Sequence, residues 1–99
     1  MLMHLPIVVL AGLPLTLVAD NVPKFDIGAE CRSEGGTQDV QARCASDEAN
    51  ARQELQGGWG EFQASDKLSC TRQTTADGTG SYVELLTCLE MTRDAKKSR

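Results

Sequence analysis

Four cysteines between positions 31 and 88 of this 99-residue chain constrain its fold more than any other feature. Gaps of twelve, twenty-five and seventeen residues separate Cys31, Cys44, Cys70 and Cys88. Structural zinc sites usually take their ligands from close pairs such as C-x₂-C, and this chain has no such pair. The same absence argues against a thioredoxin-like redox motif. The spacing therefore favours two structural disulfides, provided that the chain folds in an oxidising compartment.

The first nineteen residues indicate such a compartment. Met1–Ala19 contains no Asp, Glu, Lys or Arg, and charge begins abruptly at Asp20. Pro6 and Pro14 interrupt the apolar stretch, which suits a secretory leader better than a membrane span of about 20 apolar residues. We therefore predict a signal peptide over residues 1–19 and a periplasmic or secreted mature chain. Signal peptides usually begin with a positively charged segment, and here no Lys or Arg precedes the apolar stretch. An uncleaved anchor or a cytosolic chain is therefore the alternative.

Residues 20–99 carry every Asp, Glu, Lys and Arg and all four cysteines. A chain this short supports one domain with a small core, and such domains usually need disulfides for stability. The formal net charge of −4 argues against nucleic acid as a partner, since a nucleic-acid interface is basic. It argues equally against attraction to an anionic membrane surface. We expect no nucleic-acid partner, and no membrane contact once the leader is removed.

Three helices are expected in this domain, which makes the fold class all-α. The first spans residues 38–63, where apolar residues recur at separations of seven, four, four and three and so share one face. Gly57 and Gly58 weaken this helix, because glycine is unfavourable in a helix interior. We expect the helix either to fray at these residues or to let the backbone of another segment approach it closely. The residues of this face are Cys44, Ala51, Leu55, Trp59 and Phe62.

The second helix is shorter and spans residues 66–74, with Ser65 as its N-cap and Leu68 facing inward. The third begins after a glycine-rich loop. Ser81 and Glu84 match a capping box, in which each side chain satisfies a backbone donor of the other residue. The apolar face of this third helix consists of Tyr82, Leu85, Leu86 and Leu89.

Residues 20–36 contain Pro23 and three glycines and show no apolar periodicity. We expect this segment to be an irregular N-terminal arm, tied down at Cys31. The predicted architecture is therefore a small disulfide-stapled three-helix hairpin arrangement over residues 37–99, preceded by the arm.

The depth of the cysteines in the predicted helices favours one pairing. If the second and third helices pack antiparallel, Cys70 and Cys88 lie at comparable depths and form one disulfide. Cys31 would then pair with Cys44 and tether the arm. The alternative of Cys44–Cys88 with Cys31–Cys70 remains open, because the first helix can also cross the third. The sequence excludes none of the three connectivities.

Residues 20–99 contain no histidine, since His4 lies in the leader. This excludes Ser-His-Asp and Cys-His catalysis and histidine ligation of a metal. Acidic residues are abundant, but the glutamates, Glu48 and Glu84 among them, are expected on solvated faces rather than in a dry catalytic cleft. We therefore predict that the chain is not an enzyme and has no catalytic, metal-ligating or cofactor-binding residues.

Aromatic side chains are the best candidates for a contact surface. Trp59 and Phe62 share one helical face, where such residues are more often core than a ligand platform. Tryptophan is also enriched at interfaces, so an interaction surface of Trp59, Phe62 and Tyr82 is the competing interpretation. The leading hypothesis is a non-enzymatic exported module, structural or interacting with an unidentified protein partner. The alternative is a small-molecule or lipid carrier with an apolar groove around Trp59.

The segment SYVELLTCLEM, from Ser81 to Met91, followed by Arg93-Asp94-Ala95, resembles the C-terminal segment of short uncharacterised exported proteins of soil alphaproteobacteria. The resemblance extends over residues 44–95. It implies a bacterial source and an exported chain, and it implies no particular activity. The earlier positions that carry it are Ala51-Arg52, Leu55, Trp59, Phe62 and Cys70.

Overall fold

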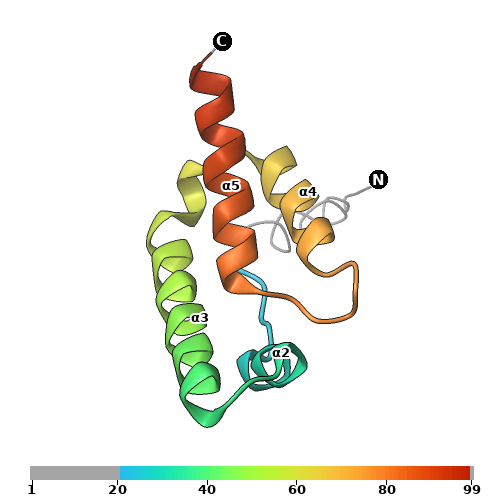
Figure 1. Cartoon of the computed structure of the whole chain (residues 1–99). Helices are drawn as coiled ribbons and strands as arrows, with labels where there is room; N and C mark the ends of the chain where they lie inside the picture. The colour runs from blue at the N-terminus through green and yellow to red at the C-terminus, as the bar shows by residue number, and fades with distance from the viewer. Residues whose placement is uncertain (1–20, 99) are drawn as a thin grey trace, which may run out of the picture.

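The computed structural model describes residues 21–98, which form four α-helices and one short 3₁₀ helix (Figure 1). No strand occurs within these residues, so the all-α prediction is confirmed. The signal peptide predicted over residues 1–19 lies outside the described residues. In chain order the elements are α2 (Ile27–Glu34), α3 (Gln38–Gly58), η2 (Trp59–Glu61), α4 (Ala64–Thr74) and α5 (Tyr82–Lys97).

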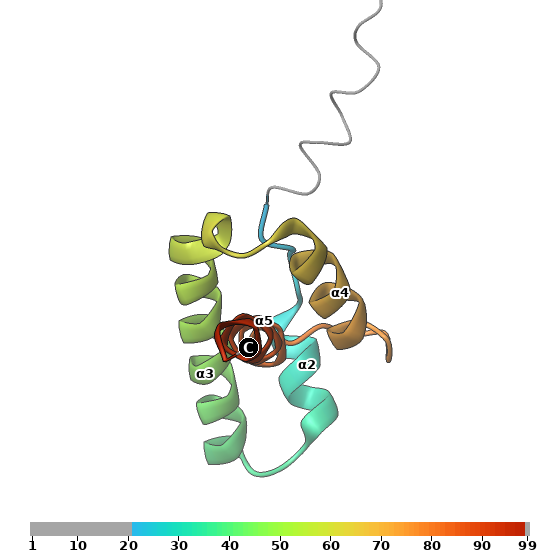
Figure 2. The same cartoon turned by 90° about the horizontal axis from the view of Figure 1, so that it is seen from above.

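Helix α5 is the central element, with α3, α4 and α2 arranged around it (Figure 2). Its C-terminal end extends beyond α3 and α4 (Figure 1). The core lies where α3, η2 and α4 meet α5, and it follows the apolar faces predicted for the first and third helices. The buried core residues are Ala51, Leu55, Trp59, Cys70, Tyr82, Leu85 and Leu89.

The predicted irregular arm is right only in part: residues 22–26 have no regular structure and Cys31 tethers the segment, but Ile27–Glu34 form helix α2, which was not predicted. Asp26 caps this helix, and its carboxylate accepts a hydrogen bond from the Ala29 N–H at 3.0 Å. A helix of 8 residues is too short to be stable alone in water. Its stability comes from tertiary contacts, which apolar periodicity does not reveal, and the Cys31–Cys44 disulfide to α3 is the strongest of them.

Both disulfides have the pairing favoured by the depth argument. Cys31 is bonded to Cys44 and Cys70 to Cys88, and in each pair the Cα atoms are 5.7 Å apart. The first bond joins α2 to α3, and the second joins α4 to α5. No cysteine among residues 21–98 is free.

The boundaries of the two middle helices differ from those expected. Helix α3 ends at Gly58 and the chain turns through η2, so the two glycines mark the end of the helix. Another backbone does not approach them, since a Cβ at Gly57 or Gly58 would meet nothing within 4 Å. Helix α4 begins at Ala64, before the N-cap predicted at Ser65, and its actual N-cap makes no side-chain hydrogen bond.

The inward position on α4 belongs to Lys67 and not to Leu68. Lys67 is 9% exposed and Leu68 is 56% exposed. The Lys67 ammonium lies over the Trp59 ring, 5.1 Å from its centroid, so its charge interacts favourably with the face of the indole. A hydrophobicity pattern assigns lysine to the surface and therefore misplaces the face of this helix.

The segment before α2 is fixed to the start of α5 by Tyr82. Its hydroxyl donates a hydrogen bond to the Pro23 carbonyl at 2.9 Å and accepts one from the Phe25 N–H at 2.8 Å. The rings of Phe25 and Tyr82 are 4.8 Å apart between centroids. Gly80 allows this approach, because a Cβ at that position would collide with the Phe25 ring.

Candidate functional site

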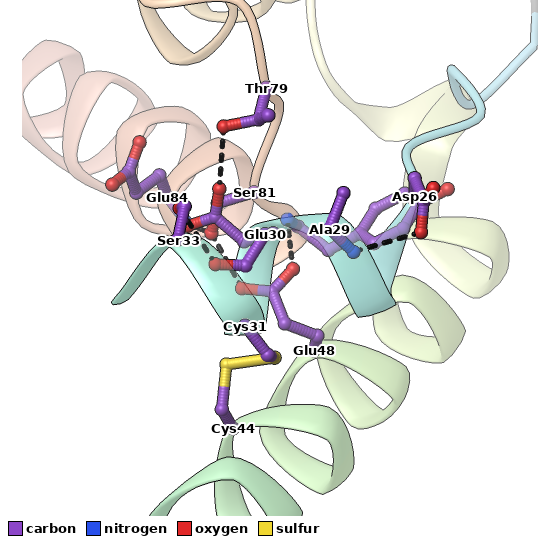
Figure 3. Close-up of a disulfide and its surroundings, with 11 residues drawn as sticks. Asp26, Ala29, Glu30, Cys31, Ser33, Cys44, Glu48, Thr79, Ser81 and Glu84 are labelled. Carbon is purple, nitrogen blue, oxygen red and sulfur yellow. Dashed lines mark hydrogen bonds between the residues drawn. A yellow bond between two sulfur atoms is a disulfide. The ribbon is translucent and has the colours of Figure 1, made fainter. Parts of the chain in front are cut away.

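The buried polar centre of the molecule is the carboxylate of Glu48, which α3 carries to the N-terminus of α5 (Figure 3). One oxygen accepts a hydrogen bond from the Ser81 hydroxyl and the other accepts one from the Tyr82 backbone N–H, both at 2.6 Å. Glu48 is 3% exposed, so the prediction that it lies on a solvated face is wrong. A helix N-terminus presents unsatisfied N–H groups and a partial positive charge, which compensate a buried carboxylate.

One of the two hydrogen bonds of the capping box predicted for α5 is present, and the other is not. The Ser81 hydroxyl accepts a hydrogen bond from the Glu84 N–H at 3.1 Å, as predicted. Glu84 does not return the bond to Ser81. Instead, the Ser81 N–H donates to the buried Thr74 hydroxyl at 3.0 Å, and that hydroxyl lies 3.1 Å from the Glu84 carboxylate. Thr74 therefore replaces the reciprocal half of the box and attaches α4 to the same helix end.

A second buried glutamate, Glu30, attaches α2 to the loop between α4 and α5. It is 6% exposed and accepts a hydrogen bond from the Thr79 hydroxyl at 3.0 Å (Figure 3). Burial raises the pKa of Glu30 above its ordinary value, and the nearby carboxylates of Glu34 and Asp77 raise it further. The Thr79 hydrogen bond lowers this pKa and opposes the other effects.

The polar centre holds helices together. The carboxylates of Glu30 and Glu48 accept hydrogen bonds from residues at or near the start of α5, and this stabilises the junction of α2, α3 and α5. Within residues 21–98, no group of three or more possible ligands is placed to hold a metal ion. The physical role of the centre is to fix where α5 begins.

The aromatic surface predicted from Trp59, Phe62 and Tyr82 is not an exposed surface, and that interpretation is wrong. Trp59 is 7% exposed and Tyr82 is 2% exposed, and both belong to the core. Phe62 is half-buried and packs against this core. The core interpretation of Trp59 and Phe62 is the one that the structure supports. The burial of Trp59 beneath Lys67 gives no support to a carrier groove around the indole.

The exposed surface lies on the side of α5 that faces away from the core, and the sequence reasoning missed it. Val83 is 38% exposed and Met91 is 67% exposed, whereas Leu85 on the opposite side of the helix is completely buried. The available signal was the recurrence of Val83, Thr87 and Met91 every four residues. We define the outer face of α5 as Val83, Thr87, Glu90, Met91 and Asp94, which share one side of the helix at separations of three and four.

A surface cavity of about 440 Å³ runs along this outer face. Val83, Thr87 and Met91 line it from α5, and Gln73 lines it from α4. The remaining lining residues include Glu84 and the disulfide-bonded Cys88, and none of the lining residues is Lys or Arg. The cavity is therefore a depression of mixed apolar and polar lining, whose one charged residue, Glu84, is acidic.

The basic residues near the end of α5 turn toward a different cavity, of about 260 Å³, beside Phe62 and the start of α4. The Arg93 guanidinium lies 5.4 Å from the centroid of the Phe62 ring. The Lys96 ammonium is 2.7 Å from the Asp66 carboxylate and also donates to Gln63. Arg93 additionally pairs with Asp94 at 3.2 Å. Arg93 and Lys96 thus face Phe62 and the start of α4, and Arg93 also reaches Asp94 on the neighbouring side of α5.

Comparison of the chain with protein-family models, curated proteins and solved structures finds no match. The resemblance to exported alphaproteobacterial proteins therefore stays a prediction. Across residues 21–98, no helix has both the length and the apolar character of a membrane span.

Proposed function

We propose that this chain is an exported, non-enzymatic helical module that acts by contacting another protein through the outer face of α5. The observation that carries the proposal is the exposure of Val83 and Met91 on a helix whose opposite side carries the fully buried Leu85 and Leu89. Methionine is enriched at the centres of protein interfaces, because its flexible and polarizable side chain adapts to a partner. The adjoining 440 Å³ cavity offers space for a partner side chain.

The way in which α5 is held also favours a contact role. Glu48 and Ser81 fix its first turn, and the Cys70–Cys88 disulfide fixes its middle to α4. Lys96, close to the end of the helix, is bonded to Asp66. A surface that is already rigid loses little conformational entropy on binding, so more of the contact energy becomes affinity.

Export is the part of the proposal that rests on the uncharged leader and the two disulfides. Disulfides are typical of secreted and periplasmic proteins and rare in the cytosol. The absence of histidine from residues 20–99 supports the non-enzymatic part, since histidine is the commonest general base and metal ligand. We place the mature chain in the periplasm or outside the cell.

A photo-crosslinking amino acid at Thr87 tests the contact directly in the producing cell. We expect one discrete adduct whose partner is identified by mass spectrometry, and we expect Met91→Asp to abolish it. Val40→Asp is the matched control, because Val40 is 41% exposed on α3 and the substitution introduces the same charge elsewhere. If no adduct forms, or if the adduct persists in a folded Met91→Asp variant, the proposed contact surface is wrong.

A further inference from the structure

The geometry points to a partner of defined chemistry for the outer face of α5: a basic amphipathic segment of another protein, with an apolar centre flanked by lysine or arginine. This inference rests on the proposed function and specifies the partner that the same surface would select. Its physical basis is the lining of the 440 Å³ cavity, which includes Val83, Met91 and the carboxylate-bearing Glu84 but no Lys or Arg.

Carboxylates accompany the apolar residues of the outer face. Glu90 follows Thr87 by three residues and Asp94 follows Met91 by three, so both lie on the same side of the helix. Glu84 lines the cavity from the margin of this side. A partner that covers Val83 and Met91 therefore brings its own flanking groups close to carboxylates, and lysine or arginine there would gain favourable electrostatic interactions.

The cations closest to the outer face do not neutralise it fully. Lys96 is bonded to Asp66 on the α4 side. Lys97 lines the same cavity as Lys96 and, three residues after Asp94, is the cation at the C-terminal edge of the outer face. Arg93 divides its interactions between the Phe62 ring and Asp94, which leaves Glu90 without an ion pair among residues 21–98. The net charge of −4 over the whole chain adds a weaker attraction for a basic partner at longer range.

The same charges disfavour the other occupants of this surface. A second copy of the chain packed face to face would place carboxylates of the two outer faces against each other, and like charges across an interface oppose association. An anionic lipid surface would be repelled for the same reason. A helical segment fits the shape, since Val83, Thr87 and Met91 form an inclined ridge on α5, against which the ridges of a second helix pack, and Gln73 lines the cavity from α4.

Two synthetic amphipathic peptides with identical leucine faces test the charge preference. One carries lysine and the other glutamate beside the apolar face, and each is titrated against the full, disulfide-bonded chain by fluorescence anisotropy. We expect the lysine peptide to bind about tenfold more tightly at low salt and to weaken as salt screens the charges. Equal affinities, or tighter binding of the glutamate peptide, would overturn the inference.

A charge-reversed variant locates the preference on the outer face. Thr87→Lys with Glu90→Lys should reverse the order of the two peptides. Gln53→Lys with Glu54→Lys makes the same change in charge on exposed positions of α3 and should preserve the order. Reversal in both double variants would show that net charge alone is responsible, and preservation in both would show that the outer face plays no part; either result would overturn the inference.

The crosslink at Thr87 separates failure of this inference from failure of the proposed function. An adduct with a basic amphipathic stretch of another protein supports both. An adduct with an acidic or neutral stretch, or with a second copy of the chain, leaves protein contact standing and overturns the basic partner. The absence of any protein adduct, or an adduct with lipid alone, overturns both.

Discussion

At the residue scale, Glu48 is the side chain on which most of the structure converges. It belongs to α3, yet both of its carboxylate oxygens accept hydrogen bonds from residues at the start of α5. Burying a carboxylate is unfavourable unless hydrogen bonds replace its hydration. Here Ser81 and Tyr82 provide that replacement, and the partial positive charge of the helix N-terminus adds to it.

Replacing Glu48 should therefore destabilise the fold more than replacing an exposed glutamate. Glu48→Ala leaves the Ser81 hydroxyl and the Tyr82 N–H without their acceptor, and we expect a loss of about 2–3 kcal/mol in the free energy of unfolding. Glu48→Gln retains one acceptor oxygen, so about 1 kcal/mol is expected. Urea unfolding measures both. Glu54→Ala, at an exposed position of α3, is the control, and equal losses at the two positions would contradict the assigned role of Glu48.

Glu30 gives the molecule a pH dependence of definite sign. Because its pKa in the folded state is raised, mainly by burial, the folded state binds the proton more tightly than the unfolded state does. The resulting stabilisation is complete below the unfolded pKa and is lost as pH rises through the raised folded value. The stability of the native chain relative to Glu30→Gln should therefore fall as pH increases from mildly acidic to neutral.

Urea unfolding of both proteins over that range tests this expectation, since contributions of the other groups cancel in the difference. Glu54→Gln controls for the loss of one carboxylate on an exposed face. A difference between the native chain and Glu30→Gln that rises with pH would show that the Thr79 hydrogen bond outweighs burial.

At the scale of the elements, the sequence predicted those helices whose apolar faces are regular. Ala51, Leu55, Leu85 and Leu89 recur at helical spacing, and the structure buries all of them. Helix α2 was missed because an 8-residue helix held by a disulfide and a buried glutamate needs no apolar periodicity. The inward face of α4 was misplaced because a lysine over an indole fills a position that hydrophobicity assigns to leucine.

The dependence of α2 on its disulfide leads to a local prediction. In Cys31→Ser with Cys44→Ser, the backbone amides of α2 should lose most of their protection from hydrogen exchange, because so short a helix does not persist without its tether. Helices α3 and α5 should retain theirs, since their packing does not use this bond. Hydrogen exchange resolved by mass spectrometry measures both, and unchanged protection in α2 would show that Glu30 and Asp26 suffice to hold it.

At the scale of the whole molecule, the fold consists of two disulfide-linked helix pairs joined through α3 and α5. The Cys31–Cys44 bond links α2 to α3 and the Cys70–Cys88 bond links α4 to α5. No disulfide crosses between the pairs, so packing and the Glu48 hydrogen bonds maintain the junction. The sequence could not predict Glu48 at this junction, since its partner residues lie 33 and 34 positions away along the chain.

The small core makes the disulfides decisive for global stability. The two bonds span sequence separations of 13 and 18 residues. Closing loops of about this size contributes about 3 kcal/mol each in the chain-entropy model, against a total stability of about 4–12 kcal/mol for a domain of about 80 residues. Reduction with dithiothreitol should therefore lower the melting temperature by tens of degrees or abolish cooperative unfolding, as followed by circular dichroism at 222 nm. Oxidised dithiothreitol at the same concentration controls for solvent effects. An unchanged melting curve, with mass spectrometry showing four free thiols, would mean that packing alone sustains the fold.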